Sequence, residues 1–464
     1  MNKTAGVVSA DKQMTSEVQV TFKTNLPEEY QVPEVFISIA TGSTNKELTQ
    51  ILKQLMSEDN VDIKGKKFNF MINSVFITTT VQDLFDKLGL QNEEGVEIYY
   101  QFALDKPKPT HSIPQDEWIS TIRSLSHIMN EKAKTYIVGF FNGDVKVFSK
   151  NDHQELLNIK QLHQDSMIQD ALFLKNDLLD KKIVVTCSNL PQSELRIGEI
   201  TQVNGKFGYS QIAQSRESDY GNINDGFKCL SSNPMNNEYI CSAYTSSEQA
   251  PEKAILIWRM NKHTLEGDSS QNQIKSQGGM KRVKTNIAYI GSHSQIVCNG
   301  GVQCMKWATP EKIYVGSNDH SVKIINVEKQ AIEEVMFTNY KVPTCIDSAQ
   351  DSLVLTGHED ASIKLWDVRT GASEKKYKAS FEGHSSWISQ VKFNNNVENL
   401  FISGSYDGTV KMWDIRNEEM PLATLKRKGD AKVDDYKVFG VEWNGASQIL
   451  SGGSDSNISV HTIA

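Results

Sequence analysis

Two stretches of this sequence are copies of one pattern, and this repetition limits the possible fold more than any other feature. Residues 357–367 read GHEDASIKLWD and residues 404–414 read GSYDGTVKMWD, so a turn aspartate stands six residues before a tryptophan in both. Weaker copies place the turn residue and its apolar or aromatic anchor at 319 and 325, at 455 and 461, and at 142 and 148. Units of about 40–45 residues, each with several short strands, are typical of propeller blades.

The spacing of the anchors predicts seven blades over residues 117–464. Two more divergent copies complete the series of anchors, which are Phe148, a residue near Ile197, Trp258, Ile325, Trp366, Trp413 and His461. A single blade cannot bury both of its faces, so neighbouring blades must stack around a central channel. The last unit is one strand short. We expect residues 104–116 to serve as a linker and as the strand that closes the ring, which also removes an exposed sheet edge.

The residues before the repeats form a separate, more acidic segment. Residues 17–102 contain 13 acidic residues, 7 lysines and no arginine, whereas the whole chain has a net charge of −8. Apolar patterning predicts strands at 18–22, 35–40, 68–72, 75–77 and 96–102. A capping box at Thr44 and Glu47 predicts a first helix, and Gly89 is expected to end a second, short helix over 81–88. We therefore predict a flexible N-terminus over 1–16 and a ubiquitin-like α+β roll over 17–103, in a chain that is mainly β.

The polar residues of the repeat are interpreted as structural. The turn aspartates can tie adjacent loops by hydrogen bonds with the histidine of a Gly-His pair, and the tryptophans pack between the sheets. The residues in question are Asp319, Asp360, Asp407, Asp455, His384, Trp366 and Trp413. His384 could instead be a general base, but its Gly-His context favours the structural role.

No motif for catalysis or cofactor binding is present. The sequence lacks a phosphate-binding loop, a dinucleotide fingerprint, a zinc-protease helix, a nucleophile elbow and an EF-hand loop. We therefore predict a protein that is not an enzyme and has no cofactor. Six cysteines without a CxxC pair, a polar N-terminus and the lack of a long apolar run predict an intracellular protein without disulfides or membrane spans.

Two segments offer chemistry of another kind, and each has two interpretations. Residues 261–287 read as a flexible polar insertion, and its basic residues Lys281, Arg282 and Lys284 form either a solvated loop or a nuclear-import or RNA-binding patch. The cluster at 426–428 has the same two interpretations. Glu93 and Glu94 lie in a short acidic loop, which is either a solvated turn or a source of a carboxylate ligand for a partner's Mg²⁺.

The order of a ubiquitin-like domain, a proline-containing linker and a seven-bladed WD-repeat propeller resembles two related groups of ribosome-assembly factors. These are the WD-repeat subunit of the Pescadillo/block-of-proliferation complex and Notchless. Three stretches favour the first group. Residues 116–120 resemble the start of its first blade, residues 433–443 resemble its last-blade signature, and the basic insertion follows the third blade as it does there.

This resemblance implies a scaffold for large ribosomal subunit biogenesis in the nucleolus and nucleoplasm, needed for maturation of the large-subunit and 5.8S rRNAs. The propeller would bind the propeller of the block-of-proliferation partner, and through it Pescadillo, within the pre-ribosomal large subunit. The ubiquitin-like domain would bind the AAA ATPase midasin, which removes the complex from the pre-ribosome. Glu93, or the adjacent Glu94, would be a ligand to midasin's metal ion.

Two alternatives remain open from the sequence. The first is a Notchless-like pre-ribosome factor, which differs in the particle that co-purifies with it. The second is a WD-repeat substrate adaptor of a ubiquitin ligase, which a ligase-docking helix would favour, and the sequence shows no such helix.

Overall fold

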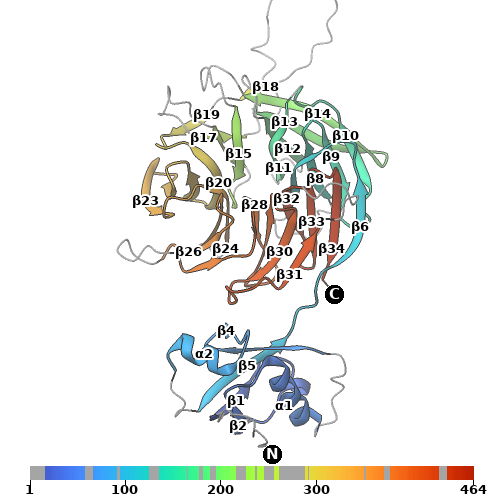
Figure 1. Ribbon diagram of the computed structural model, residues 1–464. Helices are drawn as coiled ribbons and strands as arrows, with labels where there is room; N and C mark the ends of the chain where they lie inside the picture. The colour runs from blue at the N-terminus through green and yellow to red at the C-terminus, as the bar shows by residue number, and fades with distance from the viewer. Residues whose placement is uncertain are drawn as a thin grey trace, which may run out of the picture. The chain divides into compact units, whose positions relative to one another are not determined.

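The computed structural model forms two compact units, Met1–Asp105 and Lys106–Ala464, each drawn in Figure 1. The residues it describes are 16–57, 66–90, 95–124, 135–164, 166–176, 181–188, 195–215, 226–235, 238–244, 255–260, 288–290, 292–349, 352–369, 377–427 and 436–463.

The N-terminal unit is a mixed five-stranded sheet that shares one apolar core with two helices. The strand order is β2-β1-β5-β3-β4, with β1 and β5 parallel. The elements are β1 (Glu17–Lys23), the 3-10 turn η1 (Glu28–Tyr30), β2 (Ile37–Ala40), α1 (Asn45–Ser57), β3 (Phe68–Ile72), β4 (Val75–Phe76), α2 (Val81–Leu88) and β5 (Val96–Phe102).

Local signals explain where the two helices begin and end. The backbone N–H and the hydroxyl of Thr44 both donate to Glu47, at 2.8 and 3.0 Å, before α1 begins. Thr80 and Asp83 form a capping box at the start of α2. Gly89 ends α2 with φ at 66°, a left-handed conformation that a residue without a Cβ adopts readily.

The C-terminal unit is a ring of seven antiparallel blades, and Figure 1 shows the sheets arranged around a central axis. Blade 1 consists of β7 (Ile119–Ser124), β8 (Thr135–Phe140), β9 (Val145–Ser149) and β10 (Glu155–Ile159). Blade 2 consists of β11 (Ile168–Asn176), β12 (Lys181–Ser188), β13 (Arg196–Val203) and β14 (Lys206–Ser215). Blade 3 consists of β15 (Phe227–Ser232), β16 (Tyr239–Tyr244), β17 (Ile255–Arg259) and β19 (Ser292–Ile296).

The remaining blades follow the same order, with the innermost strand first. Blade 4 consists of β20 (Val302–Thr309), β21 (Lys312–Ser317), β22 (Ser321–Asn326) and β23 (Ala331–Phe337). Blade 5 consists of β24 (Pro343–Ala349), β25 (Leu353–His358), β26 (Ile363–Asp367) and β27 (Ala379–Phe381). Blade 6 consists of β28 (Ile388–Phe393), β29 (Leu400–Ser405), β30 (Thr409–Asp414) and β31 (Ala423–Lys426). The predicted fold class is confirmed.

Blade 7 joins the two ends of the unit. It consists of β32 (Val438–Asn444), β33 (Gln448–Gly453), β34 (Asn457–Thr462) and β6 (Lys108–Pro114), which comes from the beginning of the unit. β6 pairs antiparallel with β34, with Ser112 opposite Ser459. The strand drawn in blue-green beside the red β34 in Figure 1 is this closing strand.

Blade 2 carries an additional strand that sequence patterning does not predict. β18 (Ala288–Ile290) pairs in parallel with β14 before the chain returns to blade 3 as β19. The segment between β17 and β18 therefore connects two strands that belong to different blades.

Candidate functional site

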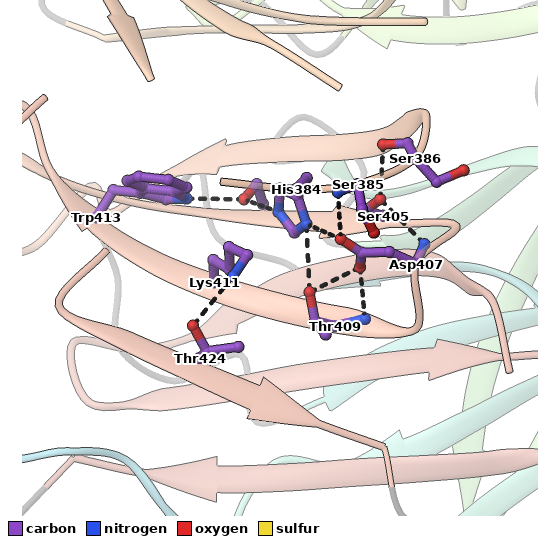
Figure 2. Close-up of polar contacts among 10 residues, drawn as sticks. His384, Ser385, Ser386, Ser405, Asp407, Thr409, Lys411, Trp413 and Thr424 are labelled. Atoms are coloured by element: carbon purple, nitrogen blue, oxygen red, sulfur yellow. Dashed lines mark hydrogen bonds and ion pairs between the residues drawn. The ribbon is translucent and has the colours of Figure 1, made fainter. Parts of the chain in front are cut away.

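The sixth blade contains a chain of hydrogen bonds that runs from its core to the loop at its end (Figure 2). The indole N–H of Trp413 donates to Ser403 Oγ at 2.8 Å, and Ser403 Oγ lies 2.8 Å from Nε2 of His384. Nδ1 of His384 lies 2.8 Å from Oδ2 of Asp407, and Thr409 donates to the other carboxylate oxygen at 2.7 Å. The residues come from the loop before β28, from strands β29 and β30, and from the turn between these two strands. The network therefore ties the loop before the innermost strand to the second and third strands.

The protonation states follow from the environment of each group. Burial lowers the pKa of His384, although Asp407 opposes this effect, so the imidazole is neutral at physiological pH. Burial opposes ionisation of Asp407, but hydrogen bonds from His384 and Thr409 hold the pKa of its carboxyl well below the usual range. A neutral ring can donate from Nδ1 to the carboxylate and accept at Nε2 from the Ser403 hydroxyl. With every polar group engaged, the geometry favours the structural interpretation of His384.

The fifth blade reproduces this arrangement with a histidine from a different position. Trp366 Nε1 donates to Thr356 Oγ1 at 2.8 Å, and that hydroxyl lies 2.8 Å from Nε2 of His358. Thr356 and Ser403 occupy equivalent positions in their blades. Each lies on the second strand, opposite the residue of the third strand that stands two positions before the tryptophan. Burial lowers the pKa of His358 to about 3. His358 belongs to β25, so the usual spacing of a Gly-His pair does not reveal its role.

In blade 7 an arginine takes the place of the histidine. Arg427 Nε lies 2.6 Å from Oδ2 of Asp455, and its Nη1 donates to Ser451 Oγ at 3.1 Å. Both side chains of this ion pair are almost completely buried. Of the basic cluster at 426–428, the structure therefore assigns Arg427 to the interior of a blade, and interpreting that residue as part of a nucleic-acid patch is wrong.

Blade 2 lacks a large anchor at the corresponding position. By strand register, that position is Gly198, one residue after the predicted Ile197. A Cβ at Gly198 would lie 2.0 Å from the ring of Tyr209, so this ring on the fourth strand occupies the space of an anchor. The blade retains a buried histidine, because Nε2 of His163 lies 2.9 Å from Thr186 Oγ1, and burial lowers the pKa of His163 to about 3.

The other blade residues singled out from the sequence are paired locally. Asp360 accepts from both the backbone N–H and the hydroxyl of Ser362, at 3.1 and 2.6 Å. Asp319 accepts from Lys323 Nζ at 2.5 Å, and this lysine also donates to Ser317 Oγ. In blade 4 a lysine of the third strand thus contacts the turn aspartate.

A cavity of about 1310 Å³ occupies the centre of the propeller and is lined by residues of all seven innermost strands. Six charged residues on these strands alternate in sign around the channel, from blade 4 through blade 7 to blade 2. We call them the inner ring: Lys306, Asp347, Lys392, Glu442, Arg123 and Asp170. The N–O distances are 2.9 Å for Lys306–Asp347, 3.8 Å for Lys392–Glu442 and 2.9 Å for Arg123–Asp170.

The acidic members of the inner ring also satisfy backbone groups of the next blade. Asp170 in blade 2 accepts from the N–H of Leu230 in blade 3 at 3.0 Å, and Asp347 in blade 5 accepts from Phe393 in blade 6 at 2.9 Å. Burial opposes ionisation of Asp347, but Lys306 and Lys392 hold the pKa of its carboxyl well below the usual range. Innermost strands have one edge without a ladder partner, so these acceptors stabilise the ring between blades.

The functional candidates from the sequence lie elsewhere. The described residues do not include Glu93, Glu94, Lys281, Arg282 or Lys284. Among the described residues, no group of three or more His, Cys, Asp or Glu side chains could hold a metal ion. Within the same residues, no helix is long and apolar enough to cross a membrane.

Comparisons with known families agree with both units. Residues 18–85 match the NLE (NUC135) domain, and residues 337–367 and 375–414 match the WD domain, G-beta repeat. The chain is thus an NLE-domain protein with a WD-repeat propeller. The solved structure of Raptor from Chaetomium thermophilum superimposes with a TM-score of 0.56 at 12% identity, over 78% of this chain and 30% of that one, a similarity of fold alone.

Full-length relatives give a more specific result. The ribosome biogenesis protein WDR12 homolog of Oryza sativa subsp. japonica is 23% identical over 450 residues, which cover 96% of each chain. The homolog of Arabidopsis thaliana is 24% identical over 457 residues, 96% of this chain and 97% of that one. That of Aedes aegypti is 22% identical and covers 93% of this chain and 92% of its own. The chain is therefore similar over almost its whole length to WDR12-homolog ribosome biogenesis proteins, and the resemblance seen in the sequence is confirmed.

Proposed function

We propose that the chain is a non-enzymatic scaffold for assembly of the large ribosomal subunit, needed for maturation of the large-subunit and 5.8S rRNAs. The observation that carries this proposal is similarity over 96% of the chain to proteins named for ribosome biogenesis, including both the NLE domain and the propeller. The buried hydrogen-bonded networks of the blades support a scaffold, because the polar groups of the type that catalysis uses are occupied by structural partners.

The propeller of this chain binds the propeller of the block-of-proliferation partner, and Pescadillo joins the complex through that partner. The assembled complex acts on the pre-ribosomal large subunit in the nucleolus and nucleoplasm. The basic residues Lys281, Arg282 and Lys284 serve nuclear import or contact with rRNA in this proposal. Resemblance to the family supports these assignments.

The ubiquitin-like domain binds midasin, and Glu93, or its neighbour Glu94, donates a carboxylate oxygen to midasin's Mg²⁺. Carboxylate oxygens are ligands that Mg²⁺ prefers. Pulling by the ATPase then removes the complex from the pre-ribosome. The position of Glu93 after the short helix α2, which ends at Leu88, supports this assignment.

Binding of the full chain to midasin's metal-site domain tests this proposal. Wild type, Glu93→Ala, Glu94→Ala and the control Glu34→Ala, an exposed carboxylate of the same unit, are compared with Mg²⁺ and with EDTA. We expect Mg²⁺-dependent binding that Glu93→Ala abolishes and Glu34→Ala retains. Equal binding with EDTA would contradict the metal bridge.

Purification of tagged chain from cells separates the alternatives. Recovery of Pescadillo and the block-of-proliferation protein with large-subunit precursors supports the proposal. Recovery of a different pre-ribosomal particle would favour the Notchless-like factor, and recovery of ubiquitin-ligase subunits would favour the substrate adaptor.

A further inference from the structure

The chain passes from the N-terminal unit directly into the closing strand of the propeller. The first unit ends at Asp105 and β6 begins at Lys108, so only Lys106 and Pro107 separate them. β6 pairs with β34 of blade 7, and the chain then continues through Gln115 into blade 1. A load on the N-terminal unit therefore enters the propeller at the Lys108 end of β6, before it reaches any other strand.

β6 has fewer buried side chains than the outer strands of other blades. Six of its seven residues are exposed, and only Ile113 is half-buried. The corresponding strands of blades 1 and 3 to 6 each bury at least one side chain, and these strands are β10, β19, β23, β27 and β31. Segments with few buried contacts have the lowest free energy of local opening. Of these six strands, β6 should therefore open most easily.

The end of β6 that takes the load is also its weaker end. Pro109 lies opposite His461 and has no N–H to donate, and the register shifts here between Val460 and His461. The side-chain bonds at this end are those of Thr110, whose hydroxyl donates to the carbonyl of Val460 and lies close to Thr462 Oγ1, both at 3.2 Å. This end is therefore held by an interrupted ladder and one threonine.

The opposite end of β6 is fastened to two blades. The N–H of Gln115 donates to the carbonyl of Ser456 in blade 7 at 2.7 Å, and Lys146 of β9 in blade 1 donates to Gln115 Oε1 at 2.9 Å. Asn457 Nδ2 donates to Ser112 Oγ at 2.6 Å. The bonds of a strand that is loaded at its weaker end break one after another. Opening therefore begins at the loaded end and stops at Gln115.

We propose that β6 is a release strand: a load on the N-terminal unit peels it from β34 while the other strands of the propeller stay folded. Ile458 and Val460, both completely buried, then lose Ile113 as a neighbour, and the junction of blades 7 and 1 loosens. A pull thus opens the ring locally and does not unfold it. The inference rests on the proposed function only for the source of the load, because the response of the strand is a property of this chain.

Force spectroscopy of the full chain with optical tweezers tests the proposal. Asp105 and Ala331 are each replaced by p-azidophenylalanine to carry DNA handles, and Ala331 is exposed on β23, across the ring from β6 (Figure 1). We expect a first event that lengthens the chain by no more than about 25 Å, because seven residues span at most ~3.6 Å each. A first event of roughly 140 Å, the length of a 40-residue blade, would overturn the proposal.

A disulfide between the two strands identifies the segment that opens. Lys108 lies opposite Thr462, so Lys108→Cys/Thr462→Cys can be oxidised across the ladder, and the six native cysteines are free and buried. We expect the first event to disappear in the oxidised chain and to return with dithiothreitol. Persistence of the event with the disulfide formed would show that another segment opens first, and the proposal would be wrong.

Two threonine variants test where peeling begins. Thr110→Val removes the side-chain bonds of the loaded end and should raise the rate of the first event at constant force about fivefold. Thr424→Val is the matched control, because Thr424 on the outer strand β31 accepts from Lys411 at 3.1 Å outside the path of the load. Equal effects of the two variants would contradict peeling of β6. The measurement contains no ATPase, so its failure leaves the midasin proposal standing, and loss of midasin binding leaves the peeling result standing.

Discussion

At the scale of single residues, the blades solve one packing problem with different side chains. The hydroxyl of the second strand is contacted by His384 in blade 6, by His358 in blade 5 and by Arg427 in blade 7. A buried hydroxyl requires a partner, but the partner need only reach it with a polar nitrogen. Divergence of the repeat therefore changes the identity of the cross-link without removing it.

The buried ion pair of blade 7 should be far more important to stability than a surface pair of similar geometry. Arg427→Met leaves Asp455 buried without its cation, and loss of one partner of such a pair costs about 3–5 kcal/mol of unfolding free energy. The control is Arg369→Met, which breaks a pair with Asp367 whose guanidinium is exposed. Urea unfolding of the full chain should show a clear loss for the first and no measurable change for the second. Equal effects would contradict the buried role of Arg427.

The histidines with depressed pKa values predict acid sensitivity. The pKa of His163 and of His358 is about 3 in the folded chain, against an ordinary value of about 6.5 in the unfolded chain. The unfolded state therefore binds more protons once the pH falls below 6.5, so stability is highest above 6.5 and declines towards pH 3. At pH 5 each histidine should cost on the order of 2 kcal/mol, because one pKa unit corresponds to about 1.4 kcal/mol.

Urea midpoints at pH 7.5, 6.0 and 5.0 measure this effect. His163→Gln keeps a side chain that can bond Thr186 but does not titrate, so its midpoint should fall less steeply with pH than that of wild type. His293→Gln, at an exposed position, should follow wild type. The histidine explanation fails if all three chains show the same pH dependence.

The residues of the candidate site were predictable from the sequence where the repeat is intact. Asp407, His384 and Trp413 stand at repeat spacing and lie within one hydrogen-bonded network. The equivalent roles of His163, His358 and Arg427 were missed, because each lies outside the Gly-His spacing and is recognised only by strand register.

At the scale of elements, blade 2 shows how a side chain from the neighbouring strand can fill the space of a missing anchor. Tyr209 on β14 fills the space above Gly198 on β13, and the two strands are joined by an Asn204–Gly205 turn in which both residues have positive φ. Such a turn suits the twist of a tight hairpin. The sequence placed an anchor near Ile197, because periodicity counts positions along the chain and cannot see a ring contributed by the next strand.

A double-mutant cycle at these two positions tests whether the Tyr209 ring fills the space that an anchor side chain occupies in other blades. Gly198→Ala places a methyl group against the Tyr209 ring and should cost about 1–3 kcal/mol by overpacking. In a Tyr209→Ala background the same change should cost much less, with a coupling within about 0.5–3 kcal/mol. Gly208→Ala, whose Cβ would have a nearest neighbour at 3.4 Å, is the matched control. Additive effects in urea unfolding would show that Tyr209 does not occupy this space.

At the scale of the whole molecule, stability depends on ring closure and on the contacts between blades. The seven anchors made the number of blades predictable, since each unit must stack on two neighbours. The inner ring was not predictable, because its charged residues lie on different blades, far apart in the sequence. In the sequence alone each of them resembles an ordinary surface residue. Asp170 and Asp347 each connect their own blade to both neighbouring blades, to one through an ion pair and to the other through a backbone hydrogen bond.

Ring closure by β6 predicts the consequence of two neighbouring truncations. A chain that begins at residue 106 retains β6, whereas one that begins at residue 116 leaves β34 as an open edge with Ile458 and Val460 deprived of Ile113 as a neighbour. Because an unpaired edge also promotes association between chains, the shorter chain should melt at a markedly lower temperature and aggregate. The longer chain should keep the melting temperature of the propeller in the full chain. Thermal unfolding followed by tryptophan fluorescence, with light scattering, distinguishes them. If both truncated chains melt at the same temperature, the propeller does not depend on its closing strand.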